Sequence, residues 1–379
     1  MNYNEKIINR VKYVIKKGEK DFGKICQCCD GAFPLDVLSA LYEISKFTEI
    51  EMYKDSSDII RRINNFIQPE PHPIDYDWRF TLKTAKLIVD YIRNIGNKIA
   101  LLGVPSIYNM LNSDNNKITL FDRNPFFNNS EKKNRKSKVI TQDLSRPLSQ
   151  KFSYYDVIVM DPPWYADHYE SWLENALKLS KNDSIIIITL FPPLIRPSAS
   201  EERERLLNLF AKIGNVYKLA YKVEYETPIF EIETLKGLKL PILKNWRLGD
   251  LYSIHVKNRS IPYSFRHPKE PDWNRYCINS QIIAIKEDPS DNYEKLEVKS
   301  IYEDGSYLLR SVSARETIRE KIDFWTSRNR CLSIKGRKRL KKFLFELTEG
   351  TSPEYILNNL SKDDDERDAI NLIIALIGL

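Results

Sequence analysis

The stretch of sequence that decides the fold runs from Tyr155 to Tyr165 and reads YDVIVMDPPWY. Residues 157–160 are apolar and mostly β-branched, which predicts a strand buried on both faces of a mainly parallel sheet. Strands of this kind carry functional groups at their carboxyl ends, and this one ends at Asp161. Pro162 and Pro163 fix φ and lack a backbone donor, so we expect the chain to leave the sheet as a rigid extended loop.

The same loop has the chemistry to hold a flat group that carries an amine. The Asp161 carboxylate and a proline carbonyl would accept hydrogen bonds from the amine, while the ring of Trp164 or Tyr165 stacks on the flat face. The alternatives are an ordinary loop after a strand and a tryptophan that only packs in the core.

Helices and apolar strands alternate between residues 74 and 257, which predicts a doubly wound α/β sheet of the Rossmann-like type. The expected strands are 98–103, 117–121, 138–142, 156–160, 184–190, 216–225 and 250–257. The expected helices are 81–95, 105–112, 168–180 and 200–213.

Residues 1–68 form the first flank of this domain and have helical periodicity. The turn at Gly31, followed by Pro34, predicts the start of a second helix. A possible wing strand at 47–53 would make the region a winged-helix module, and a small helical cap is the alternative. Three prolines at alternate positions within 68–73 predict an extended linker and a domain boundary.

Residues 258–379 form the second flank, which we expect to be an α+β region. Candidate strands are 281–286, 296–302 and 307–311, the last two joined by a hairpin turn at 303–306. Beyond residue 314 the pattern predicts helix to the end, including a basic helix.

Composition places few limits on function. The 379 residues are 42% hydrophobic and 29% charged, which is typical of a globular protein of two or three domains. No window reaches the length of a membrane span and the first residues are not signal-like, so we expect a cytoplasmic protein without a membrane partner. Cys26, Cys28 and Cys29 lack a nearby histidine, so no metal site is expected.

A candidate cofactor site precedes the Asp161 loop. Residues 98–108 predict a strand, a tight turn at Gly103, and a helix that begins at Pro105 and Ser106. A helix N-terminus favours negative charge, so such a turn suits a carboxylate or a ribose. The Gly-rich dinucleotide fingerprint is absent, since Gly103 stands alone in this stretch.

Two further strands also end in acids. Asp122 follows the strand 117–121, where a carboxylate can accept hydrogen bonds from ribose hydroxyls. Asp143 follows the strand 138–142, where it could receive an adenine amine. A helix cap or a surface carboxylate is the alternative for each acid alone, but their order before Asp161 favours a cofactor pocket.

These segments resemble the "probable N-6-adenine methyltransferase" family. The resemblance rests on residues 99–108 (IALLGVPSIY), on 121–122 and on the DPPW of 161–164, and it extends over about residues 75–257. Residues 77–85 (DWRFTLKTA) are similar to the family segment that borders the donor pocket, which implies a cofactor role for Thr81.

The resemblance implies a class I methyltransferase that uses S-adenosylmethionine. In amino-methyltransferases the Asp-Pro-Pro-aromatic motif holds the exocyclic amine of adenine or cytosine, which implies catalytic roles for Asp161, Pro162, Pro163 and Trp164. The donor turn precedes this motif, an order seen in ribosomal-RNA adenine methyltransferases, in a lysine methyltransferase of elongation factor 1A and in bacterial branched-polyamine synthases.

Three interpretations remain open. The first is adenine methylation in RNA or DNA, the second is transfer to a protein lysine or a polyamine, and the third is a non-catalytic nucleic-acid-binding subunit. The net charge of +7 and two basic stretches favour a nucleic-acid partner, and a protein partner is also possible. The candidate phosphate contacts are Lys132, Lys133 and Arg135 in one stretch and Arg337, Lys338 and Arg339 in the other; a solvated helix face is the alternative for the second.

Overall fold

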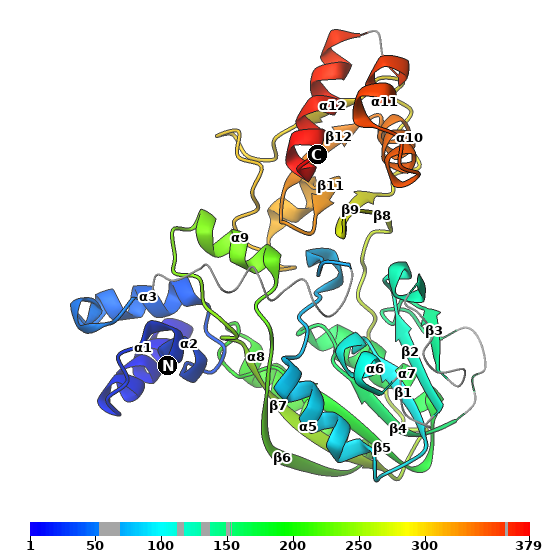
Figure 1. The fold of residues 1–379 in the computed structure, drawn as a ribbon. Coiled ribbons are helices and arrows are strands. Elements are labelled where there is room, and N and C mark those ends of the chain that lie inside the picture. Colours follow the sequence, from blue (N-terminus) through cyan, green and yellow to red (C-terminus); the bar gives the residue numbers. More distant parts are fainter. Residues whose placement is uncertain (53–68, 112–116, 130–136, 149–151, 153, 361–362) are drawn as a thin grey trace. The chain divides into compact units, whose positions relative to one another are not determined.

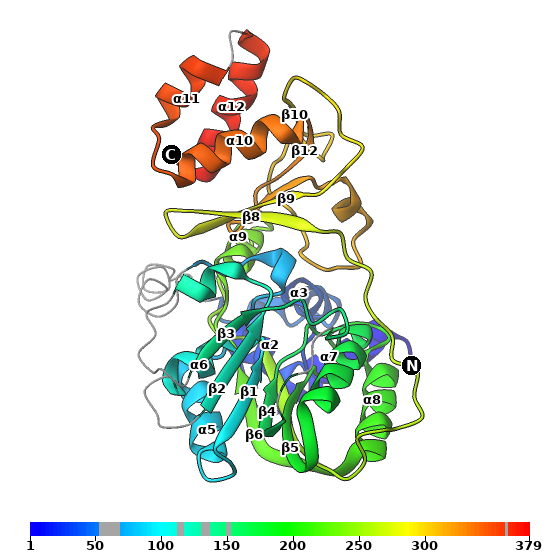
Figure 2. The same cartoon turned by 90° about the vertical axis from the view of Figure 1, so that its right-hand side faces the viewer.

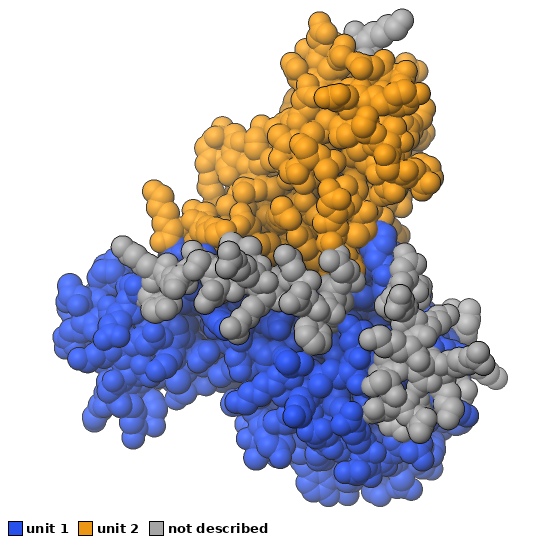
Figure 3. Space-filling view, viewed as in Figure 1, with its two compact units in different colours: residues 1–67, 78–227, 240–269 blue, residues 68–77, 228–239, 270–379 orange. Residues whose placement is uncertain are grey.

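The computed structural model describes residues 1–52, 69–111, 117–129, 137–148, 152, 154–360 and 363–379. The chain forms two compact units (Figure 3). Unit 1 comprises residues 1–67, 78–227 and 240–269, and unit 2 comprises 68–77, 228–239 and 270–379. The domain boundaries expected from the sequence stay predictions.

Unit 1 is built on a seven-stranded sheet with the strand order β3-β2-β1-β4-β5-β7-β6 (Figure 1). β7 is antiparallel to both of its neighbours, and the other pairs are parallel. The strands are β1 (Lys98–Leu102), β2 (Lys117–Asp122), β3 (Lys138–Thr141), β4 (Tyr155–Met160), β5 (Ser180–Leu190), β6 (Gly214–Glu224) and β7 (Leu248–Val256).

Helices cover both faces of this sheet (Figure 2). Alternate residues of each strand point to opposite faces, so Val157 and Val159 of β4 pack toward one helical layer and Ile158 and Met160 toward the other. The first layer contains α5 (Leu82–Ile92) and α6 (Pro105–Leu111), and the second contains α7 (Ala166–Leu179) and α8 (Ala199–Ile213). The doubly wound, Rossmann-like sheet expected from the sequence is confirmed.

The first residues of unit 1 form three short helices rather than two: α1 (Tyr3–Lys16), α2 (Phe22–Cys28) and α3 (Pro34–Glu43). The expected wing strand is wrong at its start, because Phe47–Glu49 is a turn of 3-10 helix. Residues 53–68 lie outside the described part of the chain.

Unit 2 has a five-stranded sheet with the order β10-β12-β11-β9-β8. Its elements are the 3-10 turns Pro73–Asp75 and Thr317–Lys321, the helices α9 (Ile229–Gly237), α10 (Arg337–Thr348), α11 (Pro353–Leu360) and α12 (Asp364–Ile377), and the strands β8 (Trp273–Ile278), β9 (Gln281–Lys286), β10 (Glu297–Lys299), β11 (Phe324–Thr326) and β12 (Cys331–Lys335).

Two expectations for this region are wrong. The chain beyond 314 is not all helical, because β11 and β12 precede the three helices. The expected hairpin across 303–306 does not form, because β10 pairs with β12 and residue Leu308 makes only an isolated bridge with Arg330. Pairing between segments that are distant in sequence decided both outcomes.

Candidate active site

The sheet register brings three of the predicted site positions to one edge. In the parallel pairing, Leu102 of β1 lies opposite Phe121 of β2 and Met160 of β4. The next residue is Gly103 after β1, Asp122 at the end of β2 and Asp161 after β4. These three residues therefore form a row at the carboxyl edge of the sheet. Backbone hydrogen bonds continue the row: Gly103 N–H donates to the Phe121 carbonyl at 2.9 Å.

Gly103 is required by the turn and by its surroundings. Its φ of +63° is in the left-handed region, which favours glycine. A Cβ at this position would lie 2.3 Å from the Trp172 ring of α7. The chain then enters α6 at Pro105, and Ser106 is partly exposed there. The lone glycine thus lets the sheet edge and α7 approach each other closely.

Each of the other predicted cofactor residues also has a local structural contact. Asp122 Oδ1 accepts a hydrogen bond from the Asn124 amide at 2.9 Å, and Asp143 Oδ1 accepts one from the Ser145 amide at 2.9 Å. Thr81 is the N-cap of α5 and accepts a hydrogen bond from the Thr84 amide. These bonds orient both carboxylates at strand ends, and the cofactor roles of the residues stay predictions.

The Asp161 carboxylate is held by two hydroxyl groups that sequence reasoning missed. Thr189, near the end of β5, donates a hydrogen bond to Oδ1, and the Tyr225 hydroxyl donates another to the same oxygen at 2.8 Å. Hydrogen bonds to a carboxylate favour its ionised form. Burial and the nearby Asp161 charge raise the pKa of Tyr225 well above its ordinary value, so this hydroxyl stays protonated and keeps donating.

The loop after Asp161 is fixed by Arg196. Its Nη1 donates to the Trp164 carbonyl at 2.5 Å, and its guanidinium also pairs with Glu202 of α8. The same guanidinium lies 4.4 Å from the ring centroid of Phe191 and 5.3 Å from that of Tyr165. Arg196 therefore ties the Asp-Pro-Pro-Trp loop to the loop that follows β5.

Trp164 belongs to an aromatic cluster around one arginine. Its ring meets that of Tyr225 edge to face, with the ring centroids 5.4 Å apart. The Arg247 guanidinium lies 5.6 Å from the centroid of Trp164, 3.9 Å from that of Trp78 and 5.2 Å from that of Trp246. The Trp164 side chain is partly exposed, so it packs and also presents surface at the loop.

The N-terminal helices brace both loops that border Asp161. The Tyr3 hydroxyl donates to the Leu194 carbonyl at 2.8 Å, and Gly31 packs so closely on Pro192 that a Cβ would lie 2.3 Å from the proline ring. On the other loop, Gln27 donates to the Asn245 carbonyl at 3.1 Å. This segment is therefore part of the wall of unit 1 near the site.

The predicted nucleic-acid contacts have different surroundings. Lys132, Lys133 and Arg135 lie outside the described residues. Arg337 is buried and ion-paired with Asp288, Asp291 and Asp323 within unit 2, and Arg339 is paired with Glu366. Lys338 is exposed to solvent. Most of the charge that favoured α10 as a phosphate contact is thus used in ion pairs within its own unit.

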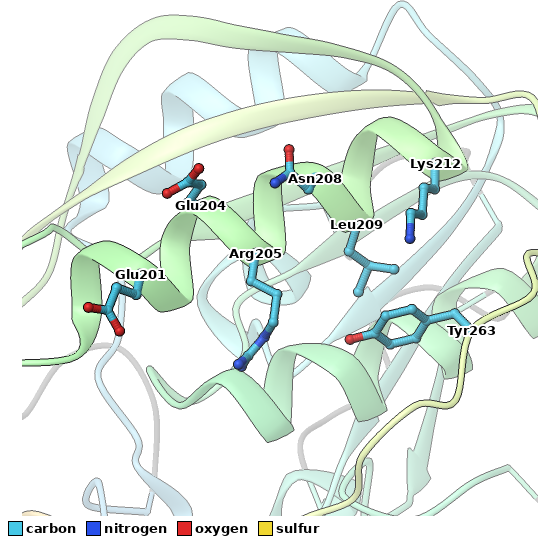
Figure 4. A pocket seen from close by; sticks show the side chains of 7 residues that line it. All are labelled: Glu201, Glu204, Arg205, Asn208, Leu209, Lys212 and Tyr263. Carbon is cyan, nitrogen blue, oxygen red and sulfur yellow. The ribbon is translucent and has the colours of Figure 1, made fainter.

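Unit 1 also has a hollow on α8 that is separate from the Asp161 loop. A hollow of about 280 Å³ on α8 has Arg205, Leu209 and Lys212 projecting on the side of Tyr263 (Figure 4). Asp161 does not line it. Among the described residues, no group of three or more His, Cys, Asp or Glu side chains could hold a metal ion, and no helix is long and apolar enough to cross a membrane.

The sequence carried a signal for some of the missed residues. Thr189 interrupts the apolar run of β5 at its carboxyl end, the same kind of signal that identified Asp161. Tyr225, Arg196 and Arg247 gave no such signal, because each reaches the site only after loops distant in sequence are brought together. Their contacts follow from the pairing of β6 with β7 and from the position of α8.

Comparisons with known proteins agree with this geometry. Residues 76–232 match the family model described as probable N6-adenine methyltransferase. A search of curated protein sequences found no match. The chain is similar in fold to the branched-chain polyamine synthase of Thermus thermophilus, with 12% identity, a TM-score of 0.52, and coverage of 71% of this chain and 90% of the synthase.

A mutein of that synthase gives 11% identity, a TM-score of 0.54, and coverage of 70% of this chain and 90% of the mutein. At these identities the likeness concerns the fold alone. The family resemblance inferred from the Asp161 loop and the Gly103 turn is confirmed by the family model. Residues 76–232 therefore match the probable N6-adenine methyltransferase family, and the fold is Rossmann-like, of the class I methyltransferase type; the cofactor of that family is S-adenosylmethionine.

Proposed function

We propose that this protein methylates the exocyclic amine of adenine in a nucleic acid, RNA or DNA. The observation that carries the proposal is the Asp161 carboxylate, held by the hydroxyls of Thr189 and Tyr225 at the carboxyl edge of the sheet and followed by Pro162 and Pro163. A carboxylate held in this way is an orienting acceptor for an amine hydrogen rather than a strong base.

This distinction separates the possible acceptors. The adenine amine is uncharged at neutral pH and needs mainly alignment. A lysine or polyamine amine has an ordinary pKa of about 10.4 and must lose a proton before it can attack. The hydroxyls of Thr189 and Tyr225 fix the Asp161 carboxylate as a hydrogen-bond acceptor, an arrangement that suits alignment of a neutral amine.

The surroundings of Trp164 also support an uncharged acceptor. The Arg247 guanidinium is 5.6 Å from the Trp164 ring centroid, so a cationic amine bound against this ring would meet a like charge. A flat base would instead stack on the exposed part of the ring. If the base comes from a duplex, its unstacking costs on the order of a few kcal/mol, which this stacking would partly offset.

The residues at the sheet edge fit the cofactor. Gly103 turns the chain with a positive φ, and carboxylates at the ends of β2 and β3 suit ribose hydroxyls and an adenine amine. Asp122 and Asp143 would hold these groups. When bound, S-adenosylmethionine supplies an electrophilic methyl group.

The protein's own contribution to the reaction is then alignment. Asp161 and the Pro162 carbonyl would accept the two hydrogens of the amine and turn the nitrogen lone pair toward the donor site. The proton released from nitrogen after transfer passes to water. Alignment of this kind accounts for up to roughly 7–11 kcal/mol of a barrier.

Aminopropyl transfer to a polyamine is the alternative that a specific observation favours. The fold similarity to the Thermus thermophilus synthase extends over 70% of this chain, well beyond residues 76–232, and that structure holds N4-aminopropylspermidine and 5'-methylthioadenosine. Lysine methylation and a non-catalytic role are the remaining alternatives. Carboxylates at three strand ends, Asp122, Asp143 and Asp161, favour a working site over a non-catalytic one.

The test measures tritium-methyl transfer to RNA, DNA, adenosine and protein pools. A parallel assay offers decarboxylated S-adenosylmethionine with spermidine. Asp161→Ala should lower methyl transfer about 100-fold or more, because the amine loses its acceptor. The matched control is Asp156→Ala, since Asp156 lies at the other end of β4 and accepts hydrogen bonds from the Asn97 and Lys98 amides.

Calorimetric titration of S-adenosylmethionine completes the test. Affinity should be lost in Asp122→Ala and kept in Asp161→Ala. Methyl transfer to adenine in nucleic acid supports the proposal. Aminopropyl transfer to spermidine, with no methyl transfer to any nucleic acid, overturns it.

A further inference from the structure

A second charged group lies beside the carboxyl end of β5, next to Thr189. We define the Asp250 cluster as Asp250 of β7 with Arg203 of α8 and Lys218 and Lys222 of β6. Arg203 Nη2 is 2.8 Å from Asp250 Oδ2, while Lys222 Nζ and Lys218 Nζ are 2.6 and 3.2 Å from Oδ1. Asp250 is 3% exposed, and the two lysine side chains are 51% and 54% exposed.

The Asp250 cluster has two more positive charges than negative ones. Burial acts to raise the pKa of Asp250, but hydrogen bonds and charge from Lys222, with Arg203 and Lys218, bring it below its ordinary value. The carboxylate is thus ionised, yet it offsets only one of the three cations. Like charges held on one carboxylate oppose each other, and an added anion would relieve this repulsion.

Lysines on an edge strand have a simpler possible role, which is to discourage pairing with another chain. β6 is one of the two edge strands of the sheet (Figure 1). That role needs only exposed lysines, however. It does not explain why Lys218 and Lys222 both reach one buried carboxylate that Arg203 already contacts.

The position of the cluster connects it to the site. Asp250 lies opposite Leu190, the neighbour of Thr189, which holds Asp161. Arg203 also donates to the carbonyl of Phe191, in the loop that follows β5. From β4 to β6 there are three strand spacings, on the order of 14 Å. This distance is suited to a phosphate near a base held at Asp161.

We propose that Lys218 and Lys222 bind a backbone phosphate of the nucleic acid whose adenine is held at Asp161. The inference rests on the proposed function and adds to it a phosphate subsite on the edge strand.

The experiment compares two double variants of the full chain. Lys218→Met with Lys222→Met leaves Asp250 paired with Arg203 one to one, so the fold keeps a balanced ion pair. The control is Lys178→Met with Lys257→Met, since these lysines are similarly exposed and are each paired with one acid, Glu174 and Asp183. Binding of short labelled single-stranded RNA and DNA is measured between about 50 and 200 mM salt.

We expect the Lys218/Lys222 variant to bind these strands about tenfold more weakly at low salt. The slope of log K against log salt should fall by about 0.7, the value for one single-strand phosphate contact. Methyl transfer to free adenosine, which has no phosphate, should be unchanged. The control variant should bind like the wild type.

The outcomes separate the two proposals. Equal affinity and slope in the wild type and the Lys218/Lys222 variant, with methyl transfer intact, overturns the subsite alone. An equal loss in both double variants also overturns it, because the effect is then one of net charge. If the wild type binds no nucleic acid and transfers nothing to it, the subsite is overturned together with the proposed function.

Discussion

Asp161 in unit 1 and Arg337 in unit 2 are both charged groups with several partners, but their partners differ in kind. Asp161 accepts hydrogen bonds from the neutral hydroxyls of Thr189 and Tyr225. Arg337 is ion-paired with Asp288, Asp291 and Asp323 at 3.1, 2.9 and 2.7 Å. Hydroxyl donors orient a carboxylate and leave its charge in place, whereas carboxylates neutralise an arginine. The first arrangement suits a site and the second a structural core.

The comparison changes how basic stretches are interpreted. The stretch that contains Arg337, Lys338 and Arg339 looks like a phosphate-binding surface in the sequence, yet Arg337 and Arg339 are paired with acids of their own unit. Lys218 and Lys222 are inconspicuous in the sequence, yet they belong to a cluster with more cations than acids. The balance of charge in space, rather than the density of charge along the chain, indicates where an anion can bind.

The largest expected effect tests the structural side of this comparison. Arg337→Met should destabilise unit 2 by about 3–5 kcal/mol, because it leaves buried carboxylates such as that of Asp291 without their cation. Asp291 also accepts hydrogen bonds from the Gly336 and Arg337 amides, so local protection should fall. Hydrogen exchange read by mass spectrometry should show faster exchange in peptides from β11 and β12.

Lys338→Met is the matched control for Arg337→Met. It removes the same charge from the neighbouring exposed position, where the expected change is within about 0.5 kcal/mol. Nucleic-acid affinity should respond little to Arg337→Met in the folded fraction. A loss of affinity with unchanged exchange in unit 2 would mean that Arg337 is a phosphate contact after all.

The next effect tests the site side of the comparison. Tyr225→Phe keeps the ring that packs on Trp164 and Phe80 and removes the hydroxyl that holds Asp161. Methyl transfer should fall about 10- to 100-fold, the equivalent of roughly 1.4–2.7 kcal/mol. The loss should lie in kcat, with the affinity for S-adenosylmethionine unchanged.

Tyr155→Phe provides the control for Tyr225→Phe. Tyr155 is a buried tyrosine at the opposite end of β4, and its hydroxyl donates to Thr119 at 3.0 Å. Its loss should cost about 1 kcal/mol of stability and leave kcat unchanged. Equal kinetic losses in both variants would assign the Tyr225 effect to the fold and not to the orientation of Asp161.

The sequence predicted the sheet well because local patterns decide its strands. Buried parallel strands such as β4 and β5 are continuous apolar runs, and Asp161 could be placed at a strand end without any structure. Unit 2 was predicted poorly for the opposite reason. β11 has three residues, and its pairing with β9 joins positions about forty residues apart, which no local pattern records.

The candidate site also contains residues that local sequence patterns predict and residues that only contacts between distant segments bring together. Gly103 and Asp161 directly follow β1 and β4, and Asp122 ends β2, so their common edge could be inferred from the order of the strands. Tyr225 reaches Asp161 across 64 residues, and Arg196 reaches the Trp164 carbonyl across 32. Such contacts depend on how loops meet after folding. The sequence thus predicted which groups lie at the edge but not which groups hold them in position.

The smallest expected effect tests whether the N-terminal helices brace the loop that follows β5 and contains Leu194. Burial, with a contribution from Asp36, raises the pKa of Tyr3 to about 12, and the Tyr3 hydroxyl donates to the Leu194 carbonyl. Below pH 10 both states keep the proton. Between about pH 10 and 12 only the unfolded chain loses the Tyr3 proton, so the free energy of unfolding falls as the pH rises. The fall is at most about 1.4 kcal/mol per pH unit, and it is smaller than this limit because the ring is partly exposed.

Tyr3→Phe should therefore flatten the decline of unfolding free energy above pH 10, measured by urea denaturation at a series of pH values. Tyr13→Phe is the control variant, because Tyr13 lies on the same helix and is 53% exposed. An unchanged slope in Tyr3→Phe would mean that α1 leaves the Leu194 loop before the sheet unfolds. In that case α1 does not stabilise the Leu194 loop, and methyl transfer should be equally insensitive to Tyr3→Phe.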